Sequence, residues 1–193
     1  DFSLLYPNPA FDLSAYTQAV RDELGAYGLN MTVTEKIKRN ESAVKSAFIK
    51  GGTQIHLLKI TSIIPPVNGV HPDEQITVKL EVDIDPPGGA DHEIKYQLLP
   101  VPYNVRIYTP PCLFAGKVHA MLCRGWKTRV KGRDFYDYIW FLSKEIPLNI
   151  KHLACRMIQS GHLPSGEDLD EIRLRSRLVE RFNHVDFEQA KND

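Results

Sequence analysis

The strand candidate at residues 76–84 and the turn residues after it constrain the fold of this 193-residue chain most. In ITVKLEVDI, charged and aliphatic side chains alternate, so they lie on opposite faces of one strand. Pro-Pro-Gly-Gly at 86–89 ends the strand, because proline and glycine interrupt regular structure. The pattern therefore predicts a sheet with one aliphatic face and one charged face.

The first part of the chain is predicted to be rich in strands. Apolar residues at helical spacing predict one helix at 13–24, which Gly25 or Gly28 ends. Gly51 and Gly52 predict a hairpin turn between two short strands. Besides 76–84, strands are expected at 1–5, 31–37, 46–49, 54–60 and 105–108.

From residue 110 onward, the apolar spacing becomes that of helices. Glycines and prolines separate the apolar runs, so several separate helices are expected. Strands followed by helices are typical of an α+β fold, and we divide the chain into residues 1–109 and residues 110–193. The helices are predicted at 112–123, 134–143, 152–160 and 167–182.

The composition limits which partners and which cellular location are expected for this chain. The chain has 24 basic and 24 acidic residues, so any binding of nucleic acid must use a local patch. No apolar run approaches the roughly 18 residues that span a bilayer, so no membrane partner is expected. The three cysteines are far apart and lack the spacing of a zinc site. They indicate reduced thiols and a cytoplasmic location.

The segment from Lys117 to Leu142 carries the most distinctive chemistry. It places Lys117 on one helix and the pattern Arg-Asp-x-x-Asp, residues 133–137, at the start of the next. Carboxylates beside cations on either side of a glycine-bearing loop suit a site for metal-bound phosphate. The carboxylates equally suit the first turn of a helix, where the macrodipole favours negative charge. Besides Lys117, five lysines and arginines lie between or beside these residues: Arg124, Lys127, Arg129, Lys131 and Arg133.

The charged face of the strand at 76–84 supports two interpretations. Glu81, Asp83 and Asp85 repel one another unless water or a cation screens them. The first interpretation is a solvated face of an antiparallel sheet. The second is a Mg²⁺ site, because Mg²⁺ prefers carboxylate and phosphate oxygens. Asp1 from another strand and Lys117 from a helix would complete it, so we expect Asp1, Glu81 and Lys117 to converge in one cleft.

A competing pattern points to a metal-dependent nuclease. Asp85 is followed by Glu93-Ile94-Lys95, which has the order Asp…Glu-x-Lys. In such a site the two acids hold Mg²⁺ and the lysine stabilises charge at the scissile phosphate. The pattern is short, and the turn at 86–89 follows Asp85 directly. We therefore keep the nuclease as a third interpretation.

Three segments resemble the AbiEii/AbiGii-type toxin family, the nucleotidyltransferase toxins of abortive-infection toxin–antitoxin systems. They are DFSLL at the start, KLEVDIDPPGG at 79–89 and LFAGKVHAMLCRGWKTRVKGRDFYDYIWFL at 113–142. The resemblance implies a polymerase β-like nucleotidyltransferase sheet with a C-terminal helical region. The first family signature is Gly-Ser and then Asp-x-Asp, and Asp1 matches the second acid. We therefore expect the N-terminal part of the fold, with the Gly-Ser and the first acid, to be missing from this sequence.

The resemblance also implies roles for individual residues. Asp1, with Glu81 or Asp83, would hold Mg²⁺. Lys117 would neutralise phosphate charge. Asp134 or Asp137 would orient Lys117, bind the base or ribose, or help to activate the acceptor hydroxyl. Independently of the resemblance, Arg124, Arg129, Lys131 and Arg133 could bind phosphates of the nucleotide or of RNA, with Trp126 stacking on a base. A solvated loop that shields the helix ends explains the same basic residues equally well.

The implied activity is transfer of NMP from an NTP, with Mg²⁺, to an acceptor, and the tRNA 3′ end is the acceptor that we favour. The implied partners are the NTP, the RNA and a cognate antitoxin encoded nearby. Without the upstream Gly-Ser and first acid, the chain could instead be a catalytically inactive module that binds the antitoxin or RNA. A Gly-Ser and Asp-x-Asp upstream of Asp1 would favour the enzyme.

Overall fold

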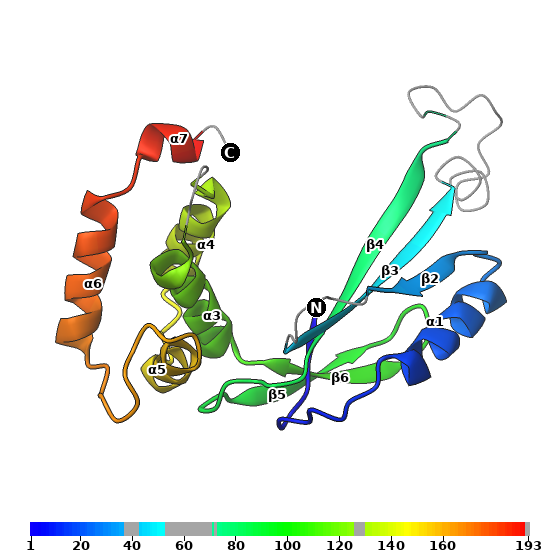
Figure 1. The fold of residues 1–193 in the computed structure, drawn as a ribbon, viewed down its shortest axis with the longest axis horizontal. Coiled ribbons are helices and arrows are strands. Elements are labelled where there is room, and N and C mark those ends of the chain that lie inside the picture. Colours follow the sequence, from blue (N-terminus) through cyan, green and yellow to red (C-terminus); the bar gives the residue numbers. More distant parts are fainter. Residues whose placement is uncertain (37–42, 53–70, 72, 126–129, 192–193) are drawn as a thin grey trace. The chain divides into compact units, whose positions relative to one another are not determined.

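The computed structural model describes residues 1–36, 43–52, 71, 73–125 and 130–191. The chain divides into two compact units, Asp1–Pro86 and Pro87–Asp193. Each unit has its own sheet (Figure 1), and each has its own core of buried side chains. The mixture of sheets and helices confirms the predicted α+β class, while the polymerase β-like topology stays a prediction.

A four-stranded sheet in the order β1-β4-β3-β2 forms the centre of the first unit. Strand β1 pairs with β4 in parallel, whereas β3 is antiparallel to both β2 and β4. The strands are β1 (Phe2–Ser3), β2 (Thr32–Glu35), β3 (Val44–Gly52) and β4 (Gln75–Asp83). Strand β4 thus confirms the strand predicted from the alternation at 76–84.

Helix α1 (Ser14–Ala26) contributes to the core of this unit, with Val20 packed against it. Val82 and Ile84 are buried there, and Leu80 is partly buried. Because side chains alternate along a strand, Glu81 and Asp83 project from the opposite face of β4. The separation of aliphatic and charged faces predicted for this strand is therefore confirmed.

The prediction of a hairpin turn at Gly51 and Gly52 is wrong. Both glycines lie inside β3, where they pair with Ile76 and Gln75 of β4. Glycine is tolerated within a strand, and the nine-residue ladder between β3 and β4 supplies backbone pairing that overrides the local turn signal. The partner strand expected at 54–60 lies outside the described residues.

The second unit begins with a hairpin of β5 (His92–Gln97) and β6 (Tyr103–Tyr108). Helices follow, and the first begins at Pro110, where we placed the start of the helical part. The compact units divide earlier, at Pro86, because β5 and β6 form a sheet of their own. The domains 1–109 and 110–193 stay a prediction. The helices are α3 (Pro110–Cys123), α4 (Gly132–Ser143), α5 (Ile150–Gln159), α6 (Glu171–Asn183) and α7 (Phe187–Lys191).

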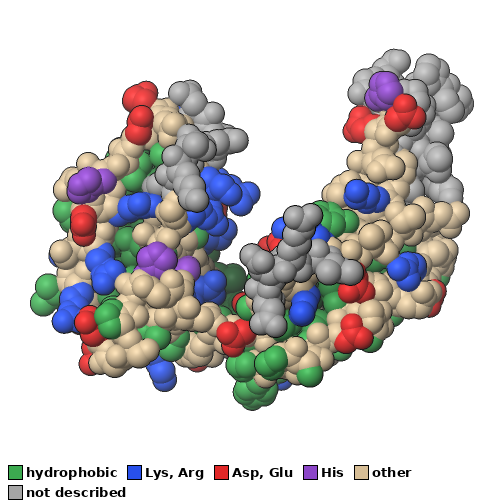
Figure 2. Space-filling view, viewed as in Figure 1, with side chains coloured by type: hydrophobic (Ala, Val, Ile, Leu, Met, Phe, Trp, Pro, Cys, Tyr) green, Lys and Arg blue, Asp and Glu red, His purple; other side chains and the backbone are tan. Residues whose placement is uncertain are grey.

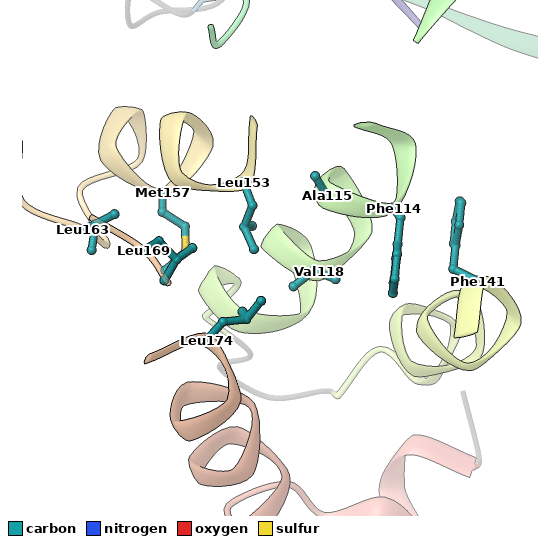
Figure 3. Packing of buried hydrophobic residues seen from close by; sticks show 9 residues of the cluster. All are labelled: Phe114, Ala115, Val118, Phe141, Leu153, Met157, Leu163, Leu169 and Leu174. Atoms are coloured by element: carbon teal, nitrogen blue, oxygen red, sulfur yellow. The ribbon is translucent and has the colours of Figure 1, made fainter. Parts of the chain in front are cut away.

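Helix α3 is the centre of the helical core (Figure 3). Ala115 and Val118 are fully buried, and the ring of Phe114 stacks on Phe141 of α4 with 5.0 Å between centroids. Leu153 of α5 is also fully buried against this cluster. Packing on several sides therefore fixes α3 against α4 and α5. Within the described part of the chain, no helix is both long and apolar enough to cross a membrane.

Candidate active site

Lys117 and Asp137 form an ion pair between α3 and α4. The Lys117 ammonium donates a hydrogen bond to Asp137 Oδ2 at 2.6 Å. The lysine side chain is 46% exposed and the aspartate side chain 28% exposed, so water and ligands reach both. Lys117 stands between the buried residues Ala115 and Val118 on a helix that packing holds in place. The structure thus brings together two of the predicted catalytic residues.

Asp134 has a different environment from Asp137. Its side chain is only 5% exposed, and its Oδ2 accepts a hydrogen bond from Arg124 Nη1 at 2.7 Å. Asp134 also lies in the first turn of α4, where the helix dipole favours a negative charge. The Arg124–Asp134 pair therefore joins the end of α3 to the start of α4. Both residues have a structural contact, so their predicted catalytic and phosphate-binding roles stay predictions.

A second arginine fixes the end of α3. Arg181 of α6 donates from Nε to the carbonyl of Met121 at 2.9 Å and from Nη2 to the carbonyl of Arg124 at 2.7 Å. These bonds satisfy carbonyls that a helix end leaves without partners in the helix. Our sequence reasoning missed Arg181, because a helix cap from a residue so distant in sequence leaves no local signal.

The predicted phosphate-binding residues are only partly described. Lys131 and Arg133 are exposed at the start of α4, beside the Arg124–Asp134 pair in sequence. Arg129 lies outside the described residues, as does Lys127. Figure 2 shows lysine and arginine side chains over the visible face of the helical unit, with acidic side chains among them. Phosphate binding by these residues stays a prediction.

The acids proposed to bind metal lie in the first unit. Strand pairing sets Phe2 opposite Val82, so Asp1 lies beside Glu81 one position earlier. Glu81 Oε1 accepts hydrogen bonds from Lys79 at 2.7 Å and from the buried Ser46 hydroxyl at 3.3 Å. Sequence reasoning missed Ser46, because only the register of β3 against β4 places it opposite Glu81.

Asp83 shares the charged face with Glu81, and its Oδ1 accepts a hydrogen bond from the Asp85 amide at 3.0 Å. Among the described residues, no three histidine, cysteine or acidic side chains gather as a metal site. The donor set nevertheless fits Mg²⁺, which proteins usually bind through one or two carboxylates together with water and substrate phosphates. Asp1 and Glu81 could supply these carboxylates. The assignment of Asp1, Glu81 and Asp83 as metal ligands stays a prediction.

Two earlier hypotheses concern residues from both units. Asp1 and Glu81 belong to the first unit and Lys117 to the second, so their convergence in one cleft stays a prediction. The nuclease hypothesis likewise combines Asp85 of the first unit with residues of the second. Its Lys95 ammonium lies 3.2 Å from a carboxylate oxygen of Glu93 on β5, so these two residues neutralise each other.

Comparison with known families identifies the class of protein. A family model described as nucleotidyl transferase AbiEii toxin, Type IV TA system, matches residues 1–193. The match identifies the class as nucleotidyl transferases that act as toxins. The chain belongs to the AbiEii family, which confirms the resemblance seen in its sequence. Membership of a toxin–antitoxin family implies an antitoxin partner. A comparison with curated proteins finds none that matches the chain.

Proposed function

We propose that this protein transfers NMP from an NTP to a hydroxyl group of RNA in a Mg²⁺-dependent reaction in the cytoplasm, with the tRNA 3′ end as the favoured acceptor. The observation that carries this proposal is the Lys117–Asp137 pair, an exposed lysine held by a carboxylate between two packed helices. The family of nucleotidyl transferases to which the chain belongs supports the reaction class.

In the proposed reaction, the acceptor oxygen attacks the α-phosphorus of the NTP. A new P–O bond to the acceptor forms, the bond from the α-phosphorus to the bridging oxygen of the β-phosphate breaks, and pyrophosphate leaves. The hydroxyl proton passes to solvent or to a nearby carboxylate. Such transfer needs mainly positioning and charge stabilisation from the protein.

Lys117 and Asp137 have separate roles in this proposal. The Lys117 ammonium stabilises negative charge on the phosphates, because a cation stabilises charge that increases in the transition state. Asp137 is a positioning residue that fixes the ammonium by the 2.6 Å contact. Asp134 supports the start of α4 through Arg124.

Asp1 and Glu81 are the proposed carboxylate ligands of Mg²⁺, with Asp83 as the alternative to Glu81. When bound, Mg²⁺ would neutralise and orient the phosphates. The Lys79 ammonium now contacts Glu81 Oε1, so binding of a divalent cation at this oxygen requires Lys79 to move away. Lys79 is half exposed, which allows this displacement.

A transfer assay tests the proposal against its alternatives. The intact protein is incubated with labelled NTP and total RNA, and the RNA is resolved by length. We expect the wild type to lengthen RNA by one or a few nucleotides with Mg²⁺ but not with EDTA. Lys117→Met and Asp137→Asn should reduce the rate by about 10²-fold or more, whereas Glu93→Gln should leave it unchanged.

Two other outcomes would contradict the proposal. RNA or DNA that is shortened by the wild type and left intact by Glu93→Gln would identify the protein as a nuclease. Binding of RNA or antitoxin without any change in RNA length, in the wild type and in every variant, would identify a catalytically inactive binding module. Thermal unfolding of each variant checks that lost activity does not reflect lost structure.

A further inference from the structure

The outward side of α4 carries an arrangement that the proposed reaction does not yet use. Arg133 lies three residues before Tyr136 and four before Asp137, and Trp140 lies four residues after Tyr136 and three after Asp137. Residues at these spacings are neighbours on a helix surface. The stripe of these four residues, which we call the α4 stripe, therefore contains the carboxylate that holds Lys117.

The aromatic residues of the α4 stripe are exposed. Tyr136 is 69% exposed and Trp140 is 43% exposed, and the Arg133 side chain is exposed as well. The Trp140 ring packs edge-on against the buried Phe141, with 5.0 Å between centroids. This packing supports the indole, so that stacking on its open side costs little side-chain ordering.

We propose that Arg133, Tyr136 and Trp140 form a platform for the unpaired 3′ end of the acceptor RNA. This inference rests on the proposed function and deepens it. Exposed aromatic rings stack on unpaired bases of any sequence, and a neighbouring arginine binds the phosphate backbone. Continuity with Asp137 places the platform beside the lysine that is proposed to contact the reacting phosphates.

The spacing of the rings favours a strand over a single nucleotide. Tyr136 and Trp140 are four residues apart on α4, which separates them by about 6 Å along the helix axis. They thus offer two stacking surfaces in a row, which suits successive bases of one strand. A duplex fits less well, because its bases already stack on each other and its edges are paired.

Ile139 provides a matched control on the same helix. It is 64% exposed and directly precedes Trp140 in sequence, but it has no ring that could stack on a base. A protein partner that covered this side of α4 would use the apolar surface of Ile139 as much as that of Trp140. RNA would use the two rings and Arg133 but not Ile139, so Ile139→Ala separates the two kinds of partner.

Fluorescence of Trp140 reports on binding directly. The chain has two tryptophans, so Trp126→Phe leaves Trp140 as the only one while keeping an aromatic ring at 126. Acrylamide should quench Trp140 in the free protein. In a separate titration without acrylamide, a single-stranded RNA oligonucleotide should reduce the fluorescence of Trp140. A blunt RNA duplex of the same length and an NTP with Mg²⁺ should not.

Variants then measure the contribution of each ring. Trp140→Ala and Tyr136→Ala should each weaken single-strand binding by about 5- to 100-fold, the range expected for the loss of one stacked base. Trp140→Phe should retain most of the binding, and Ile139→Ala should bind like the wild type. In transfer assays, Trp140→Ala should raise KM for RNA while KM for the NTP is unchanged.

The outcomes distinguish this inference from the proposed function. Quenching by the NTP as strong as that by RNA, or equal losses for Ile139→Ala and Trp140→Ala, would overturn the platform. Single-strand binding that depends on the rings but occurs in a protein without transfer activity would keep the platform and refute the transferase. Transfer that is lost in Lys117→Met but has an unchanged KM for RNA in Trp140→Ala would keep the transferase and refute the platform.

Discussion

At the scale of single residues, two ion pairs that look alike in sequence differ in burial. Both join a basic residue in or just after α3 to an aspartate of α4. Asp137 is accessible to solvent, whereas Asp134 is nearly inaccessible. An exposed pair contributes little to stability, but removing the cation from a buried carboxylate leaves an uncompensated charge. The first pair is therefore suited to function and the second to structure.

The two pairs should respond differently to loss of the cation. Arg124→Met should lower the free energy of unfolding by about 2–3 kcal/mol, because among the described residues no other cation contacts Asp134, which then keeps the α4 dipole as compensation. Lys117→Met should lower it by less than about 1 kcal/mol. Urea denaturation of both variants measures the difference. Equal losses would contradict the division of roles.

The surroundings of His119 in α3 predict that the stability of the fold depends on pH. Its Nε2 lies 2.9 Å from the Ser160 hydroxyl, which is also 3.0 Å from His162 Nδ1. Burial, with a smaller contribution from the positive charge of Arg156, lowers the pKa of the His119 imidazole to about 4. The folded state therefore favours the neutral ring. His152 behaves similarly, because burial also lowers its pKa.

A depressed histidine pKa makes the folded state more stable above the unfolded pKa of 6.5 than below it. Stability should therefore fall as the pH decreases from about 6.5 to about 4. His119→Gln removes this titration, so its pH profile should be flatter than that of the wild type by about 1–3 kcal/mol. Denaturation at several pH values tests this, and carboxylates that titrate in both proteins cancel in the difference. Parallel pH profiles of stability for the wild type and His119→Gln would refute this prediction.

At the scale of elements, the Pro-Pro-Gly-Gly turn packs closely on α5. Gly89 has φ +72°, and a Cβ atom there would lie 3.2 Å from the Lys151 carbonyl oxygen and 3.3 Å from the His152 Cα atom. His152 also hydrogen-bonds the Gly88 carbonyl at 2.8 Å through Nδ1. Gly161, after α5, has φ +74° but open space around it. The two glycines thus share a conformation and differ in surroundings.

Alanine substitutions at these glycines separate conformation from packing. Gly161→Ala should cost about 1 kcal/mol, the penalty of a left-handed conformation for alanine. Gly89→Ala should cost about 2–4 kcal/mol, because the start of α5 must also shift to make room for the methyl group. Chemical denaturation of each variant gives the values. Similar costs at both positions would show that the turn does not pack on α5 as described.

The elements that could be predicted from sequence are those with a strong local period. Helices α1, α3 and α4 have apolar faces that repeat at helical spacing, and β4 alternates cleanly. Strand β5 was missed because it is largely exposed on both faces and so has no alternating pattern. The five-residue α7 is too short for periodicity to detect. The turn expected at Gly51 failed because the ladder with β4, a distant contact, decides the structure there.

The geometry of the candidate site could also be predicted only in part from the sequence. Asp134 and Asp137 are three residues apart, so both can lie on one side of a helix, and the structure gives each a contact with a basic residue in or just after α3. Spacing could not show which aspartate is buried, because that depends on packing around Phe135, which is buried with Val130 and Ala190. The contact of Glu81 with Ser46 likewise depends on the register of β3 and β4.

At the scale of the whole molecule, Mg²⁺-dependent binding of an NTP through Lys117 is the central part of the proposed function. Lys95 provides a matched control for Lys117, because it is also an exposed lysine paired with a carboxylate and belongs to the same unit. A difference between the two lysines would therefore reflect position rather than charge.

Calorimetric titration of NTP into the intact protein, with Mg²⁺ and with EDTA, tests this claim most directly. We predict binding that requires Mg²⁺ in the wild type. Lys117→Met should weaken it by about 10- to 100-fold, because a hydrogen bond from a charged group contributes about 1.5–3 kcal/mol. Lys95→Met should bind like the wild type. Equal binding by all three proteins, with and without Mg²⁺, would contradict the account.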